Sequence, residues 1–126
     1  MRFIDRVNAS DTDALWMLST QLIAQGRGAE AIPYLERVRA TAPSAFTIAT
    51  LSVAYAQAKR VDDAVATAVA AAMVAGDTAS VYLVAGRAML VAKRYKEARG
   101  FLREAVALDP TSEPSRKALQ TAESFR

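Results

Sequence analysis

The sequence contains no cysteine and no histidine among its 126 residues. Without cysteine, the chain can form neither disulfides nor a thiolate metal site, and it has no thiol nucleophile. Without histidine, it lacks the commonest general acid–base group and the usual imidazole ligand of zinc. No other set of residues suggests catalysis, a cofactor, a metal or a small-molecule substrate. We therefore expect a protein that is not an enzyme.

Long hydrophobic runs are also missing. No stretch of about 18 apolar residues is present, so the sequence predicts no transmembrane helix. The segment Met1 to Ser10 lacks the long apolar core of a signal peptide. We expect a cytoplasmic location, and leave open a removed signal or a larger parent protein. The hydrophobic content of 52% predicts a packed core rather than disorder.

An excess of positive charge is confined to the end of the chain. Residues 1–92 carry eight basic and eight acidic side chains, whereas residues 93–126 carry eight basic and five acidic ones. The basic cluster comprises Lys93, Arg94, Lys96, Arg99 and Arg103. We interpret it as a solvated helix face, with binding to RNA or an anionic surface as the alternative. Steep weakening by salt would identify that alternative.

An alanine recurs along the chain at Ala31, Ala64 and Ala98, with spacings of 33 and 34 residues. Such a period indicates a solenoid of helical hairpins. With this alanine numbered position 20, the units cover about residues 12–44, 45–78 and 79–112. Position 8 is small in every unit, which allows the two helices of a hairpin to approach closely. Its residues are Ser19, Ser52 and Gly86.

Boundary signals agree with these units. Ser10 and Ser44 can cap the helices that follow them, and Gly76 suits a helix end. Thr111 or Ser112 can cap a last helix over residues 113–125, which would cover the exposed end of unit three. We expect an N-terminal segment, 1–11, followed by one domain, 12–126.

The sequence resembles the tetratricopeptide repeat family over nearly its whole length. The matching residues are Leu18, Leu22, Gly26, Ala31, Ile32, Leu35, Val38 and Pro43 in unit one, Leu51, Tyr55, Ala64 and Ala71 in unit two, and Gly86, Tyr95, Ala98, Ala105 and Ala107 to Pro110 in unit three. The resemblance implies an all-α fold, a right-handed α-solenoid of three antiparallel helix-turn-helix repeats with a C-terminal capping helix. It implies a non-catalytic scaffold or adaptor that binds another protein.

The resemblance also implies a concave groove lined by positions 2, 5, 9 and 12 of each first helix. These residues are Asp13, Trp16, Thr20 and Ile23, then Phe46, Ala49, Val53 and Ala56, then Ser80, Leu83, Arg87 and Leu90, with Lys117 from the last helix. The lining is mostly apolar, which predicts a partner peptide or amphipathic helix anchored on Trp16 and Phe46. The alternative is that these two aromatic rings pack against Phe3, Ile4 and Val7.

One subgroup of the family grips a C-terminal carboxylate with Lys, Asn and Arg side chains. Here the corresponding positions hold none of these types, so this mode of binding is not expected. The residues at those positions are Trp16, Thr20, Val53, Ser80 and Val84.

The second helix of unit two has no charged residue after Asp63. Its positions that normally face solvent are Ala66, Val69, Ala70 and Met73. Because a helix that is apolar all round is usually buried, this face predicts a covering partner or a second copy of the chain. We therefore keep a self-assembling structural protein as an alternative function. An alanine-rich composition that merely lowers the charge remains the simpler explanation.

Overall fold

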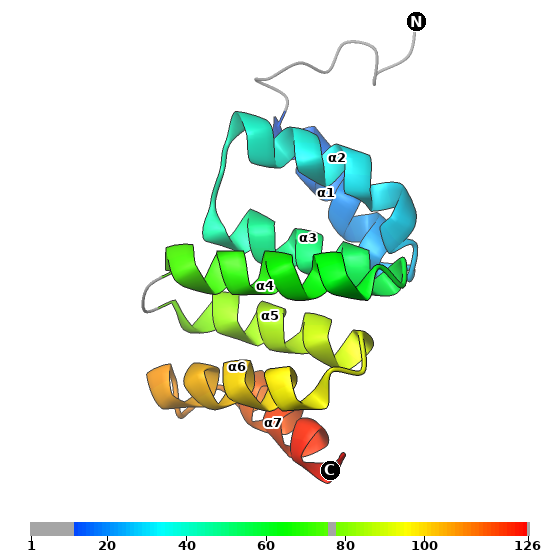
Figure 1. The fold of residues 1–126 in the computed structure, drawn as a ribbon. Coiled ribbons are helices and arrows are strands. Elements are labelled where there is room, and N and C mark those ends of the chain that lie inside the picture. The colour runs from blue at the N-terminus through cyan, green and yellow to red at the C-terminus, as the bar shows by residue number, and fades with distance from the viewer. Residues whose placement is uncertain (1–11, 76–77, 126) are drawn as a thin grey trace, which may run out of the picture.

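The computed structural model describes residues 12–75 and 78–125, which form seven α-helices and no strand. The helices are α1 (Thr12–Ala24), α2 (Gly28–Thr41), α3 (Ala45–Gln57), α4 (Val61–Ala75), α5 (Ala79–Val91), α6 (Tyr95–Leu108) and α7 (Glu113–Ser124). Consecutive helices form the hairpins α1/α2, α3/α4 and α5/α6, and α7 ends the stack (Figure 1). The predicted all-α helical-repeat solenoid is confirmed.

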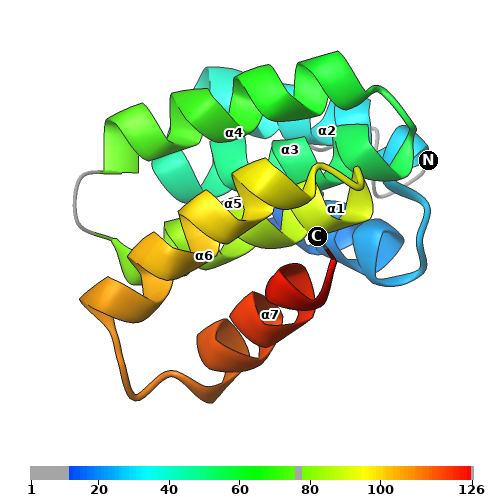
Figure 2. The same ribbon diagram turned by 60° about the horizontal axis from the view of Figure 1, so that its bottom comes forward.

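The hairpins stack unevenly along the solenoid. The first helices of units two and three, α3 and α5, pack closely along each other, whereas α1 and α3 barely touch. Helix α7 packs mainly on α6 and makes fewer contacts with α5. Figure 2 shows α7 below both of them, at the end of the stack. The loosely packed pairs are therefore α1/α3 and α5/α7, which lie where the groove was predicted to begin and end.

The repeated alanines lie at the centre of the hairpins, where Ala31, Ala64 and Ala98 are fully buried. The small residues at position 8 lie where the two helices of a hairpin approach closely. The Ser52 hydroxyl donates a 2.7 Å hydrogen bond to the Ala64 carbonyl oxygen on the opposite helix. A Cβ atom built on Gly86 would lie only 2.5 Å from the side chain of Leu102. The small residues therefore set the spacing within the hairpins.

All three hairpins turn in the same way. Gly26, Lys59 and Lys93 occupy position 15 and have positive φ angles of 76°, 65° and 63°. The residue after each of them donates its N–H to a carbonyl five residues earlier, as in a Schellman turn. Because the left-handed conformation costs a non-glycine residue about 1–2 kcal/mol, the two lysines hold it against their own preference. The sequence alone did not reveal this turn.

An ion pair follows each of these turns. Arg27, Arg60 and Arg94 precede α2, α4 and α6, and each pairs with an acidic side chain three residues on. The N···O distances are 2.6 Å to Glu30, 2.8 Å to Asp63 and 2.8 Å to Glu97. The hydrogen bond from Arg94 lowers the pKa of the Glu97 carboxyl group. Such exposed pairs contribute little stability individually, although they hold an acid at each helix start.

Side-chain caps occur at two of the predicted positions. The Ser44 hydroxyl accepts a 3.1 Å hydrogen bond from the Thr47 N–H, and Ser112 accepts one of 3.3 Å from the Ser115 N–H. Of the two candidates before α7, Ser112 is therefore the cap. The caps predicted at Ser10 and Gly76 lie outside the described residues.

Candidate functional site

The two large aromatic residues of the predicted groove contact each other. Trp16 on α1 and Phe46 on α3 have ring centroids 5.9 Å apart, with planes inclined by 53°. Trp16 is half-buried against the main core, whereas Phe46 is 41% exposed. This pair joins the first helices of units one and two, which otherwise touch little. It presents apolar aromatic surface at the N-terminal half of the predicted groove.

The other predicted groove residues differ in accessibility. Thr20, Ile23, Val53, Leu83 and Leu90 are half-buried, and all except Thr20 pack against the main core. The exposed members, besides Phe46, are Asp13, Ser80, Arg87 and Lys117.

Ala49 requires a correction, because its side chain is fully buried and offers no surface to a partner. It packs in a second, smaller cluster with Ile48, Ala71 and Val81. Ala56 is likewise buried. The reason is the close packing of α3 on α5, which covers the middle of the expected lining.

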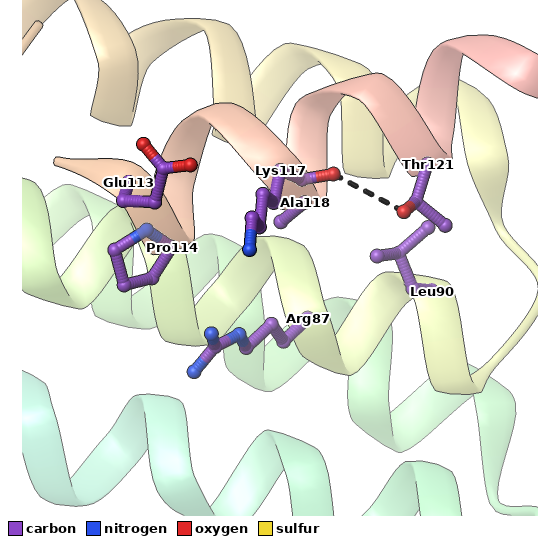
Figure 3. Close-up of a pocket in the computed structure, with 7 residues that line it drawn as sticks. All are labelled: Arg87, Leu90, Glu113, Pro114, Lys117, Ala118 and Thr121. Atoms are coloured by element: carbon purple, nitrogen blue, oxygen red, sulfur yellow. Dashed lines mark hydrogen bonds between the residues drawn. The ribbon is translucent and has the colours of Figure 1, made fainter.

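A pocket of about 520 Å³ lies between α5 and α7, at the C-terminal half of the predicted groove (Figure 3). Its lining consists of Arg87, Leu90, Glu113, Pro114, Lys117, Ala118 and Thr121. The repeat positions predicted Arg87 and Leu90, and Lys117 was expected to join them from the last helix. The other four lining residues were not predicted, because the position rule covers only the repeat units and these residues belong to the capping helix.

The apolar face of α4 is open in the described structure. Val69 is 44% exposed and Met73 is 81% exposed, and Ala66 is exposed beside them. Ala70 is half-buried because it packs on the second core cluster. Val74, which the repeat positions did not predict, is 64% exposed. The accessible apolar face therefore consists mainly of Val69, Met73 and Val74.

Three cations of the basic cluster have partners within the fold. Arg94 pairs with Glu97 as described above, and Arg103 lies 3.8 Å from Glu123 on α7. Arg99 donates a 2.8 Å hydrogen bond to the carbonyl oxygen of Phe125, whose ring stacks on Tyr95 at 4.4 Å. The contacts of Arg103, Arg99 and Tyr95 fasten α7 and Phe125 to α6. Three of the five side chains in the basic cluster therefore make contacts within the fold.

Within the two described stretches, no three acidic side chains gather in a way that could hold a metal ion. None of the helices described there has the length and apolar character needed to span a membrane.

A family model described as tetratricopeptide repeat matches residues 22–85. No curated protein matches the sequence significantly. Among solved structures, the TPR domain of Arabidopsis OM64 is similar with a TM-score of 0.72 and 16% identity, covering 95% of this chain and 100% of that one.

Two similar structures contain bound peptides. The second TPR domain of human RPAP3, in complex with the HSP70 peptide SGPTIEEVD, has a TM-score of 0.70 and 16% identity, with coverage of 92% of this chain and 98% of that one. The first TPR of Spaghetti (RPAP3), bound to the HSP90 peptide SRMEEVD, has a TM-score of 0.71 and 18% identity, with coverage of 94% of both chains. At these identities the likeness shows the fold.

Proposed function

The chain belongs to the tetratricopeptide repeat family, and on that premise we propose that it is a non-catalytic module that binds an apolar peptide or amphipathic helix of another protein. The observation that carries this proposal is the Trp16–Phe46 pair, which offers aromatic surface at the junction of units one and two. Large aromatic side chains in partly enclosed positions commonly anchor protein interfaces.

Structures of related fold that hold peptides support the choice of a peptide as partner. The nature of the peptide is a separate question. The positions that grip a terminal carboxylate in one subgroup hold Trp16, Thr20, Val53, Ser80 and Val84 in this chain. None of these side chains carries a positive charge. We therefore propose that side chains of the partner, rather than its chain end, make the main contacts in this half of the groove.

The fluorescence of Trp16 provides a direct test. It is the only tryptophan in the sequence, so all tryptophan emission comes from this one position in the predicted groove. Peptides would be selected from a random display library on the whole chain, synthesised without tryptophan and titrated. A blue shift that saturates with the peptide concentration is expected, because a bound apolar side chain excludes water from the indole. Binding without any change in emission would place the peptide elsewhere and contradict the proposal.

Replacing Trp16 by alanine is expected to weaken binding of the selected peptides about tenfold or more, because truncation removes an interface anchor. Fluorescence anisotropy with labelled peptide would measure the change. Tyr34→Ala is the matched control, since Tyr34 is also a half-buried aromatic residue packed on the main core but lies on α2. Equal losses in the two variants would indicate a general effect on folding and not a contact in the groove.

Self-assembly through α4 is the second candidate function. It is favoured by the exposure of Val69, Met73 and Val74 on one helix. Apolar side chains gathered on a surface commonly mark an interface with another protein. In this candidate, the α4 face of one chain packs against the same face of a second copy, as in a two-fold symmetric dimer.

If α4 joins two copies, Met73→Glu is expected to convert a dimer into a monomer, because the carboxylate would be desolvated at the contact. Size-exclusion chromatography with light scattering at several concentrations would measure this. Ala107→Glu is the control, since Ala107 is exposed at the same repeat position in unit three. A wild-type chain that is monomeric at all concentrations would rule out the α4 contact.

A further inference from the structure

The pocket between α5 and α7 differs in chemistry from the aromatic half of the groove. Arg87 reaches it from α5 and Lys117 reaches it from α7 (Figure 3). Both are exposed. The base of the pocket is apolar, with Leu90 on one side and Pro114 and Ala118 on the other. Two cations therefore flank an apolar recess.

Neither cation has an ion-pair partner among the residues that the structure describes. The three arginines at the hairpin turns, in contrast, all pair with an acid. Glu113 also lines the pocket, but Figure 3 shows its carboxylate turned away from Arg87. The pocket thus has a net positive charge of one, with both cations free to receive a carboxylate.

From this arrangement we infer that the pocket receives an aspartate or glutamate side chain of the partner peptide, next to an apolar residue of the same peptide. The inference rests on the proposed function and specifies the partner at the C-terminal end of the groove. Arg87 and Lys117 supply the charge complementarity, and Leu90, Pro114 and Ala118 accommodate the apolar neighbour.

The position of the pocket favours an internal side chain over a chain end. Arg87 and Leu90 occupy positions 9 and 12 of unit three, two of the positions that were expected to line the groove. Leu90 also packs on the main core, so the pocket is continuous with the body of the repeat. A peptide lying in the groove would bring side chains to the pocket, and a carboxylate on one of them would meet both cations.

The test uses the random peptide library with the C-terminus of every peptide fused to its carrier, so that only side chains supply carboxylates. Selection on the whole wild-type chain is expected to enrich Asp or Glu next to an apolar residue. Selection on the double variant Arg87→Glu/Lys117→Glu is expected to lose this preference or to replace it by Lys or Arg. The variant Arg37→Glu/Arg39→Glu on α2 is the control, because it makes the same change in charge at exposed residues.

A selected acidic peptide and its Glu→Gln or Asp→Asn version would then be titrated against the three proteins. The amide version is expected to bind wild type about tenfold more weakly, and the difference is expected to shrink at high salt. The Arg87→Glu/Lys117→Glu variant is expected not to discriminate between the two peptides.

The outcomes separate the two proposals. Peptides that bind and shift Trp16 emission, but show no preference for acids, would overturn the acidic pocket and leave the proposed function standing. The same holds if the control variant removes the preference as completely as the pocket variant does. A library that yields no binder would contradict the proposed function and this inference with it.

Discussion

Replacing Leu51 by alanine is expected to lower the free energy of unfolding by about 2–5 kcal/mol, a large part of the stability of a domain of this size. Leu51 is fully buried in the main core. It lies on α3, the helix that packs against α2, α4 and α5. Truncation would therefore remove apolar contacts and leave a cavity in the main core of the solenoid.

Urea denaturation followed by circular dichroism would measure this loss. Val91→Ala is the matched control, since Val91 is 46% exposed and its truncation should change the free energy of unfolding by less than about 1 kcal/mol. If Leu51→Ala were as mild as Val91→Ala, the junction between units one, two and three would be packed less tightly than the structure shows.

Replacing Gly28 by alanine is expected to destabilise the fold by about 1–3 kcal/mol through overpacking. A Cβ atom at this position would lie 2.7 Å from the Ala54 carbonyl oxygen and 2.8 Å from the Gln57 side chain. A backbone oxygen cannot move aside unless α3 moves with it. Gln57 is held by a 3.0 Å hydrogen bond from its Nε2 to the Ile23 carbonyl oxygen, so the added methyl group would also disturb that contact.

Gly100→Ala should have the opposite effect. Gly100 lies inside α6, and a Cβ atom there would meet nothing within 4 Å. Because alanine favours a helix interior over glycine by about 0.5–1 kcal/mol, this variant is expected to be more stable than wild type. Thermal unfolding of both variants would show opposite shifts in Tm. A destabilised Gly100→Ala, or a neutral Gly28→Ala, would contradict the packing of these two glycines.

Gly26 and Gly28 have different roles in the structure, and the sequence pattern did not predict both. Gly26 and Gly28 are separated by one residue where the turn leads into α2. The resemblance included Gly26, but nothing in the sequence pattern predicted a steric role for Gly28. In the structure, Gly26 has the positive φ angle and open space around it, whereas Gly28 has ordinary backbone angles and no space. The first role is conformational and the second is steric, and the second depends on a helix from the next unit.

The predicted groove also contains residues that the repeat positions identified correctly and residues that they did not. Repeat positions selected Trp16 and Phe46, and the structure brings their rings together. The same rule selected Ala49, which the close packing of α3 on α5 buries. The contribution of α7 to the C-terminal pocket could not be read from repeat positions, because the capping helix does not repeat the units before it.

The sequence by itself determined the class of fold and its period, because small and apolar residues recur with the spacing of helical hairpins. It also determined the cap at Ser44, which depends on local contacts within one turn. Only the tertiary structure decided which groove residues are accessible, where the pocket lies, and that Arg87 and Lys117 share it. These features depend on the distances between helices far apart in the chain, and such distances follow from how whole units pack.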